Sequence, residues 1–175
     1  PNSISVGLDG KVFIGSSDGL GERKGGVAAF DKLNPVLSGV TFAVSFEGME
    51  ELTLETGAYQ DTLQQKTPVD VETTTLLTAG GADTVRLLAL GGQTTLDTGA
   101  EEDTVEVSAG EAGVSMTLTT GDGDDVIRLW RLGQGTQADV DSGSGDDAVQ
   151  VSGARLPADS LIRVDGGQGE DTLLF

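Results

Sequence analysis

Two stretches decide the fold: Thr120-Gly121-Asp122-Gly123-Asp124-Asp125 and, 22 residues later, Ser142-Gly143-Ser144-Gly145-Asp146-Asp147. Aligning the chain on the last aspartate of each stretch reveals six copies of one motif. These aspartates are Asp61, Asp83, Asp103, Asp125, Asp147 and Asp171. They lie 22, 20, 22, 22 and 24 residues apart, and such a period is typical of a solenoid in which each repeat forms one coil.

Apolar residues keep the same register on both sides of the motif. The row seven residues before each aspartate is Leu54, Leu76, Leu96, Leu118, Val140 and Val164, and the row two residues after it is Leu63, Val85, Val105, Ile127, Val149 and Leu173. Further inward positions follow at a spacing of two, which indicates β-strands with one buried face. The repeats differ in length only in the segment that connects the second strand of one coil with the first strand of the next. We therefore predict an all-β protein, a parallel β-solenoid of about six coils with two main strands per coil.

The first 50 residues lack the motif and are predicted to form an N-terminal β cap, with the solenoid spanning residues 51–175. Ile4-Ser5-Val6 and Val12-Phe13-Ile14 alternate as strands around a predicted turn at Leu8-Asp9-Gly10, and residues 40–46 alternate in the same way. The chain starts without a leader and ends in a strand-like run, so we expect it to be part of a larger protein with neighbouring domains.

The composition narrows the range of partners. The chain has 29 Asp and Glu against 10 Lys and Arg, a formal charge of −19, which disfavours nucleic acid and anionic membranes and favours cations. It has no cysteine and no histidine, which excludes disulfides and thiolate metal sites and removes the usual zinc ligand and general base. No apolar run is long enough to insert into a membrane.

Calcium is the cation that suits the repeated turn. Stacked coils place equivalent aspartates about 4.8 Å apart, where adjacent carboxylates repel by about 1 kcal/mol in water and about 3.5 kcal/mol at an effective dielectric of 20. Ca²⁺ offsets this repulsion because it accepts carboxylate and carbonyl oxygens in forgiving geometry, whereas Mg²⁺ demands a strict octahedron. In the alternative interpretation, glycine and aspartate merely form tight turns that the carboxylate caps.

The motif resembles the glycine- and aspartate-rich repeats of the hemolysin-type, or RTX, calcium-binding family, whose consensus is G-G-x-G-x-D-x-Φ. Gly166-Gly167-Gln168-Gly169-Glu170-Asp171-Thr172-Leu173 matches it at every consensus position. The resemblance implies a right-handed parallel β-roll that binds Ca²⁺ between turns, in a protein secreted by Gram-negative bacteria. This chain departs from the family in carrying one motif per coil, so calcium is expected along one edge only. The first three copies are also degraded, since Ala79 replaces a glycine.

The predicted calcium ligands come mainly from the last three copies: Gly121, Asp122, Gly123, Asp125, Gly143, Gly145, Asp147, Gly167, Gly169 and Asp171. A weaker site reaches Asp103. Asp97, Asp141 and Asp165, each two residues before the second-glycine position, are either supporting partners of the ion or solvated turn charges.

We do not expect an enzyme, because the acidic pairs such as Asp124-Asp125 fall in the repeat, where calcium accounts for them. The predicted function is a calcium-binding structural module of a secreted or cell-surface bacterial protein, such as an adhesin. The alternative is a carbohydrate-binding or accessory module of an extracellular polysaccharide-modifying enzyme. In that case Trp130 could stack on a sugar ring, although such a residue more often covers the end of the apolar core.

Overall fold

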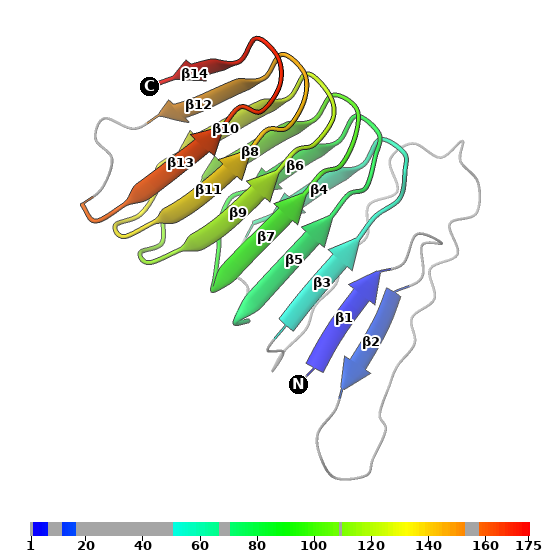
Figure 1. Cartoon of the computed structure of the whole chain (residues 1–175). Helices are drawn as coiled ribbons and strands as arrows, with labels where there is room; N and C mark the ends of the chain where they lie inside the picture. The colour runs from blue at the N-terminus through cyan, green and yellow to red at the C-terminus, as the bar shows by residue number, and fades with distance from the viewer. Residues whose placement is uncertain (1, 7–11, 17–50, 67–70, 109, 153–157) are drawn as a thin grey trace.

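The computed structural model describes residues 2–6, 12–16, 51–66, 71–108, 110–152 and 158–175. From residue 51 onward the described chain forms two six-stranded parallel sheets that face each other across a common core (Figure 1). The first sheet contains β3 (Glu51–Glu55), β5 (Thr73–Leu77), β7 (Gln93–Asp97), β9 (Ser115–Thr119), β11 (Gln137–Asp141) and β13 (Leu161–Asp165). The second contains β4 (Thr62–Gln65), β6 (Thr84–Leu87), β8 (Thr104–Ser108), β10 (Val126–Trp130), β12 (Ala148–Ser152) and β14 (Thr172–Leu174).

Successive coils stack in the register that the motif alignment predicts. In the first sheet Leu76 pairs with Leu54 on one side and with Leu96 on the other, and in the second sheet Ile127 lies between Val105 and Val149. Each strand therefore pairs with the equivalent strand of the next coil and never with its neighbour in sequence. The predicted parallel β-solenoid is confirmed.

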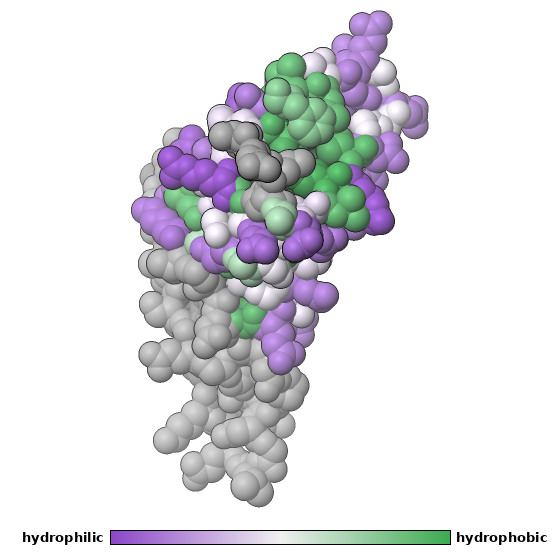
Figure 2. All heavy atoms as spheres, turned by 90° about the vertical axis from the view of Figure 1, so that its left-hand side faces the viewer, coloured by the Kyte–Doolittle hydropathy of each residue, from purple (hydrophilic) through white to green (hydrophobic). Residues whose placement is uncertain are grey.

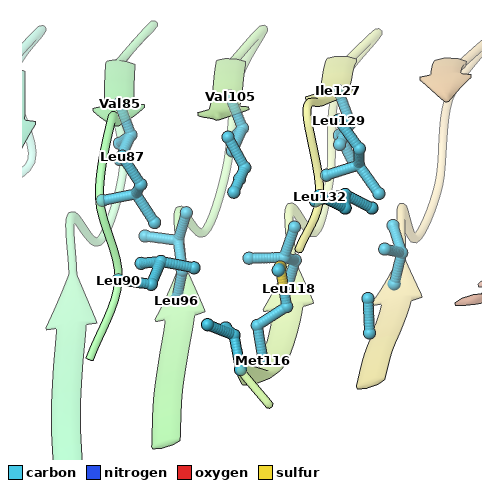
Figure 3. Close-up of a cluster of buried hydrophobic side chains, with 14 of the residues drawn as sticks. Val85, Leu87, Leu90, Leu96, Val105, Met116, Leu118, Ile127, Leu129 and Leu132 are labelled. Atoms are coloured by element: carbon cyan, nitrogen blue, oxygen red, sulfur yellow. The ribbon is translucent and has the colours of Figure 1, made fainter. Parts of the chain in front are cut away.

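The core is a column of aliphatic side chains between the two sheets. Strands such as β7 and β9 alternate between buried and outward residues, because successive side chains of a strand point to opposite faces. Figure 3 shows Leu96 and Leu118 from the first sheet facing Val105 and Ile127 from the second. The predicted inward rows are confirmed. Arg86 and Arg163, which lie between inward positions, are exposed as expected.

Two inward positions of the first sheet carry polar side chains. Thr74 and Thr94 stack on each other in adjacent coils and are buried, and their hydroxyl groups have no hydrogen-bond partner. Met116 and Ala138 occupy the same row in the next two coils. The core of the second and third coils therefore contains buried hydroxyl groups without a hydrogen-bond partner, whereas this row is apolar farther along the stack.

The N-terminal segment is described only in part. β1 (Asn2–Val6) and β2 (Val12–Ser16) form the predicted antiparallel hairpin, and β1 lies alongside β3 at the N-terminal end of the first sheet (Figure 1). The predicted turn at Leu8-Asp9-Gly10 and the predicted strand at 40–46 lie outside the described residues. None of the described residues belongs to a helix that could span a membrane.

Candidate cation site

The six motif copies form one continuous corner of the solenoid, where each coil passes from the first sheet to the second. Parallel bridges outside the named strands connect Ala100 with Asp122, Asp122 with Ser144, and Ser144 with Gln168. The backbone N–H of Ser144 donates to the Gly121 carbonyl at 2.7 Å, and that of Gln168 donates to the Gly143 carbonyl at 2.8 Å. The turns therefore continue the stacking of the strands, as their constant length predicts.

Glycine is needed where this stacking brings two backbones together. Gly121 and Gly143 have φ angles of 96° and 94°, in the left-handed region that side chains disfavour. A Cβ at Gly143 would overlap the carbonyl oxygen of Gly121, and a Cβ at Gly167 would overlap that of Gly143. The second consensus glycine thus allows close approach of neighbouring coils, whatever else the turn binds.

The motif aspartates form a ladder that runs through all six coils. The backbone N–H of each aspartate donates to Oδ1 of the aspartate in the next coil, at 2.6 Å from Asp61 to Asp83 and 2.8 Å from Asp103 to Asp125. The same hydrogen bond is 2.7 Å long from Asp83 to Asp103, 2.8 Å from Asp125 to Asp147 and 3.1 Å from Asp147 to Asp171. The carboxylates therefore point along the stack between coils, and one oxygen of each caps a backbone group as the turn-capping interpretation requires.

In four of these six carboxylates the second oxygen has no such partner. Asp83, Asp103, Asp125 and Asp147 are each no more than 2% exposed, and Oδ2 of all four makes no hydrogen bond. A buried carboxylate oxygen without a donor costs free energy, and a bound cation or a proton removes that cost. Turn capping accounts for Oδ1 and leaves this column of Oδ2 atoms unexplained.

Burial changes the acidity of the ladder. It raises the pKa of Asp83 and Asp125 to about 6, and it also raises the pKa of Asp103. The N–H of the preceding aspartate and a nearby threonine hydroxyl oppose this shift, while adjacent carboxylates add to it. A hydrogen bond from the Thr78 hydroxyl lowers the pKa of Asp83; in the structure this hydroxyl also lies 3.3 Å from the Thr98 carbonyl oxygen, and Oδ2 of Asp83 accepts no hydrogen bond.

The other acidic side chains of the motif lie on the outside of the corner. Oδ1 of Asp124 accepts the N–H of Asp146 at 2.9 Å, and Oδ1 of Asp122 accepts the Ser144 hydroxyl at 2.6 Å. Asp122, predicted as a calcium ligand, is exposed and apart from the buried column. Asp124 is exposed whereas Asp125 is buried, so this adjacent pair does not converge on one point.

The predicted residues are therefore divided between two positions. Asp103, Asp125 and Asp147 lie buried in the ladder, and Asp171 completes it as an exposed acceptor at the last coil. Among the acids that precede the turns, Oδ1 of Asp165 accepts the N–H of Gly167 at 3.1 Å. Asp83, which was not among the predicted ligands, has burial and hydrogen bonds that match those of Asp125. Its turn begins with threonine and keeps the register of the motif, but we left it out of the prediction because one consensus glycine is missing.

The donor set suits a cation shared between coils. Within the described ranges, no three or more Asp or Glu side chains converge closely enough to hold one metal ion. The ligands that remain are single carboxylate oxygens from successive coils and carbonyl oxygens of the turns. The carbonyls of Gly121 and Gly143 already accept one N–H each, and a second lone pair stays free. Such a mixed oxygen set matches the preference of Ca²⁺.

Comparison of the chain with protein-family models, curated proteins and solved structures finds no match.

Proposed function

We propose that the chain is a calcium-binding structural module in which Ca²⁺ lies between coils along the aspartate ladder. The observation that carries the proposal is the column of buried Oδ2 atoms at Asp83, Asp103, Asp125 and Asp147, none of which has a donor. Carboxylate oxygens without donors are acceptor-only groups, and a divalent cation satisfies them while also neutralising the neighbouring charge. Oδ1 of each residue is already used between coils, so Oδ2 and the turn carbonyls would hold the ion.

Binding of this kind would stiffen the stack. An ion that binds only the folded state adds RT ln(1 + [Ca²⁺]/Kd) to the free energy of unfolding. Calcium sites of extracellular modules have dissociation constants of about 0.1 to 1 mM, so they fill where calcium is millimolar. On this basis the module would belong to a secreted or cell-surface bacterial protein and would serve as a rigid spacer or scaffold for its neighbouring domains.

The test is a calcium titration followed by calorimetry and circular dichroism, with Asp125→Asn compared to Asp124→Asn. Calcium is expected to raise the Tm of the natural chain and of Asp124→Asn by many degrees, because the outer carboxylate is not in the ladder. Asp125→Asn keeps an acceptor for the Asp103 N–H but removes one charge, so its calcium-induced rise in Tm should be clearly smaller. Equal stability of the natural chain in EDTA and in millimolar calcium would leave only the turn-capping role.

A further inference from the structure

The first position of the motif carries a hydroxyl group in the first five copies and is glycine, as in the consensus, only in the last. We call four of these side chains, each no more than 1% exposed, the hydroxyl column: Thr78, Thr98, Thr120 and Ser142. Each hydroxyl donates to the backbone carbonyl at the same position of the next coil. The distance is 3.3 Å from Thr98 to the Thr120 oxygen and 3.1 Å from Thr120 to the Ser142 oxygen. The column therefore runs beside the aspartate ladder through the middle of the stack.

The same position also lies against the second oxygen of the aspartate in its own turn. A Cβ at Gly166 would lie only 2.5 Å from Oδ2 of Asp171, five residues later. Hydrogen bonding from the Thr120 hydroxyl lowers the pKa of Asp125, and Oδ2 of Asp125 has no hydrogen bond in the arrangement that the structure shows. A hydroxyl has one proton to donate. Two buried acceptors, a carboxylate oxygen and a carbonyl oxygen, therefore compete for it.

We propose that calcium decides this competition: without the ion each hydroxyl of the column donates to Oδ2 of its own turn, and with the ion it donates to the carbonyl of the next coil. A hydrogen bond to an ionised acceptor is about twice as strong as one to a neutral acceptor, so the free carboxylate attracts the proton. Bound Ca²⁺ takes Oδ2 and returns the hydroxyl to the carbonyl. This inference rests on the proposed function, because an ion in the ladder has to displace the hydroxyl.

The hydroxyl column would then be a competitor of calcium that is built into the corner. It supplies a donor to the ladder when no ion is bound, so the calcium-free chain keeps its stacked turns. It also lowers the calcium affinity, because part of the binding free energy goes into breaking the hydrogen bond to Oδ2. Glycine at this position supplies neither effect.

The middle coils are the place to test this, since coils stack on both sides of them. In the last described coil Asp171 is exposed, and Gly166 has no hydroxyl. Figure 2 shows apolar side chains gathered in the upper part of the molecule, where the strands of this coil lie, and Leu173 is 46% exposed. Asp125 is 1% exposed, so its Oδ2 depends on groups inside the corner.

Thr120→Val removes the proton donor and keeps the size of the side chain. Isothermal titration with calcium at about pH 7.5, above the pKa of about 6 of Asp125, should give about fivefold tighter binding than in the natural chain. The variant should have a lower Tm in EDTA, and calcium should raise its Tm by more. Thr120→Ser keeps the hydroxyl and should bind like the natural chain. Thr117→Val, exposed on the same strand, is the matched control and should change neither quantity.

The carbonyl of Ser142 gives a second readout, because it accepts the Thr120 hydroxyl. In carbon-13 NMR, calcium should move the Ser142 carbonyl signal downfield in the natural chain, and by less in Thr120→Val. Thr98→Val, one coil earlier, should tighten calcium binding in the same direction and replaces Thr120→Val if that variant folds poorly.

Two outcomes would overturn this inference alone. Unchanged affinity in the valine variants would make the column a link between coils that ignores the ion, and weaker affinity would make the hydroxyl oxygen a ligand. A natural chain that does not respond to calcium would refute the proposed function, and this inference with it.

Discussion

The turns of the second and third coils and those of the last three coils differ in sequence, but both contain residues with positive φ angles. Ala79 and Glu101 occupy positions that are glycine in the later turns, yet their φ angles are 72° and 80°. Gly121, which aligns with Ala79, has a φ of 96°. The aspartate ladder continues unchanged through both regions. Stacking on neighbouring coils therefore holds positive φ angles even without glycine, whereas glycine at Gly121 and Gly143 both reduces strain and allows close approach of the next coil.

The largest effect is expected where a glycine contacts the backbone of the next coil. Gly143→Ala should lower the free energy of unfolding by about 4 kcal/mol or more, because it adds left-handed strain and a backbone overlap with Gly121. Gly80→Ala is the control, since its Cβ would lie 3.8 Å from the nearest atom, the Ala100 oxygen. Urea unfolding followed by circular dichroism measures both. A similar loss in the two variants would contradict the close-contact explanation.

The pH dependence of the calcium-free chain is the next largest effect. Folding raises the pKa of Asp83 and Asp125 to about 6 from the ordinary aspartate value of 3.8, so the folded state binds more protons between these values. The stabilisation is fully present below about pH 4 and is lost as the pH rises through about 6. We expect the chain in EDTA to be more stable at about pH 5 than at about pH 7.5, on the order of 3 kcal/mol.

Calcium should reverse this preference, because it binds the ionised ladder and competes with protons. Guanidinium unfolding at several pH values, with and without calcium, checks the sign. Exposed carboxylates also titrate in this range, so Asp125→Asn serves as the reference and should flatten the slope in EDTA. An unchanged slope in that variant would assign the effect to the surface charge instead of the ladder.

Comparison of Asp83→Asn with Asp125→Asn asks whether the two regions bind calcium alike. Asp83 has the same burial and the same unpartnered Oδ2 as Asp125, although its turn lacks one consensus glycine. Each substitution is expected to reduce calcium stabilisation by a similar amount, about 1 to 2 kcal/mol at millimolar calcium. Isothermal titration should show a matching loss of bound calcium. A full calcium response in Asp83→Asn alone would restrict the ions to the glycine-rich coils.

The buried threonines of the second and third coils provide a smaller contrast in the core. Thr94→Val should raise the free energy of unfolding by about 1 kcal/mol, because it replaces a buried hydroxyl without a partner by a methyl group of similar size. Thr95→Val changes the outward neighbour on the same strand and should leave stability nearly unchanged. Thermal unfolding of the two variants distinguishes burial from a general gain in β propensity.

The smallest expected effect concerns the non-glycine turn residues. Glu101→Gly should stabilise the chain by about 0.5 to 1 kcal/mol, because relief of left-handed strain exceeds the added entropy of the unfolded chain. Glu102→Gly, at the next position, removes no positive φ angle and should be neutral or destabilising. Chemical denaturation of both variants measures the difference. A loss of stability in Glu101→Gly would mean that the side chain contributes more than its backbone costs.

The sequence analysis predicted the fold well because the solenoid is a repeating pattern. The alternation around Leu96, Leu118 and Val140 determines which faces are buried. Because these residues lie at the same distance in sequence from the motif aspartate of their coils, they also determine the pairing of strands. The motif alone did not separate the site residues by burial, because it grouped Asp122, which is exposed, with Asp125, which is buried. The missing glycine alone was the reason why Asp83 was not among the predicted calcium ligands.

The sequence by itself determined the period, the inward rows and the stacking of the six aspartates, because these follow from local alternation that keeps the same register to the motif in every coil. Only the tertiary structure decided what the aspartates contact. Oδ1 of the five aspartates from Asp83 to Asp171 accepts an N–H from a residue 20 to 24 positions away, and Oδ2 is buried in the four aspartates from Asp83 to Asp147. Hydrogen bonds and desolvation between coils are nonlocal interactions, so no single copy of the motif contains the information that sets them.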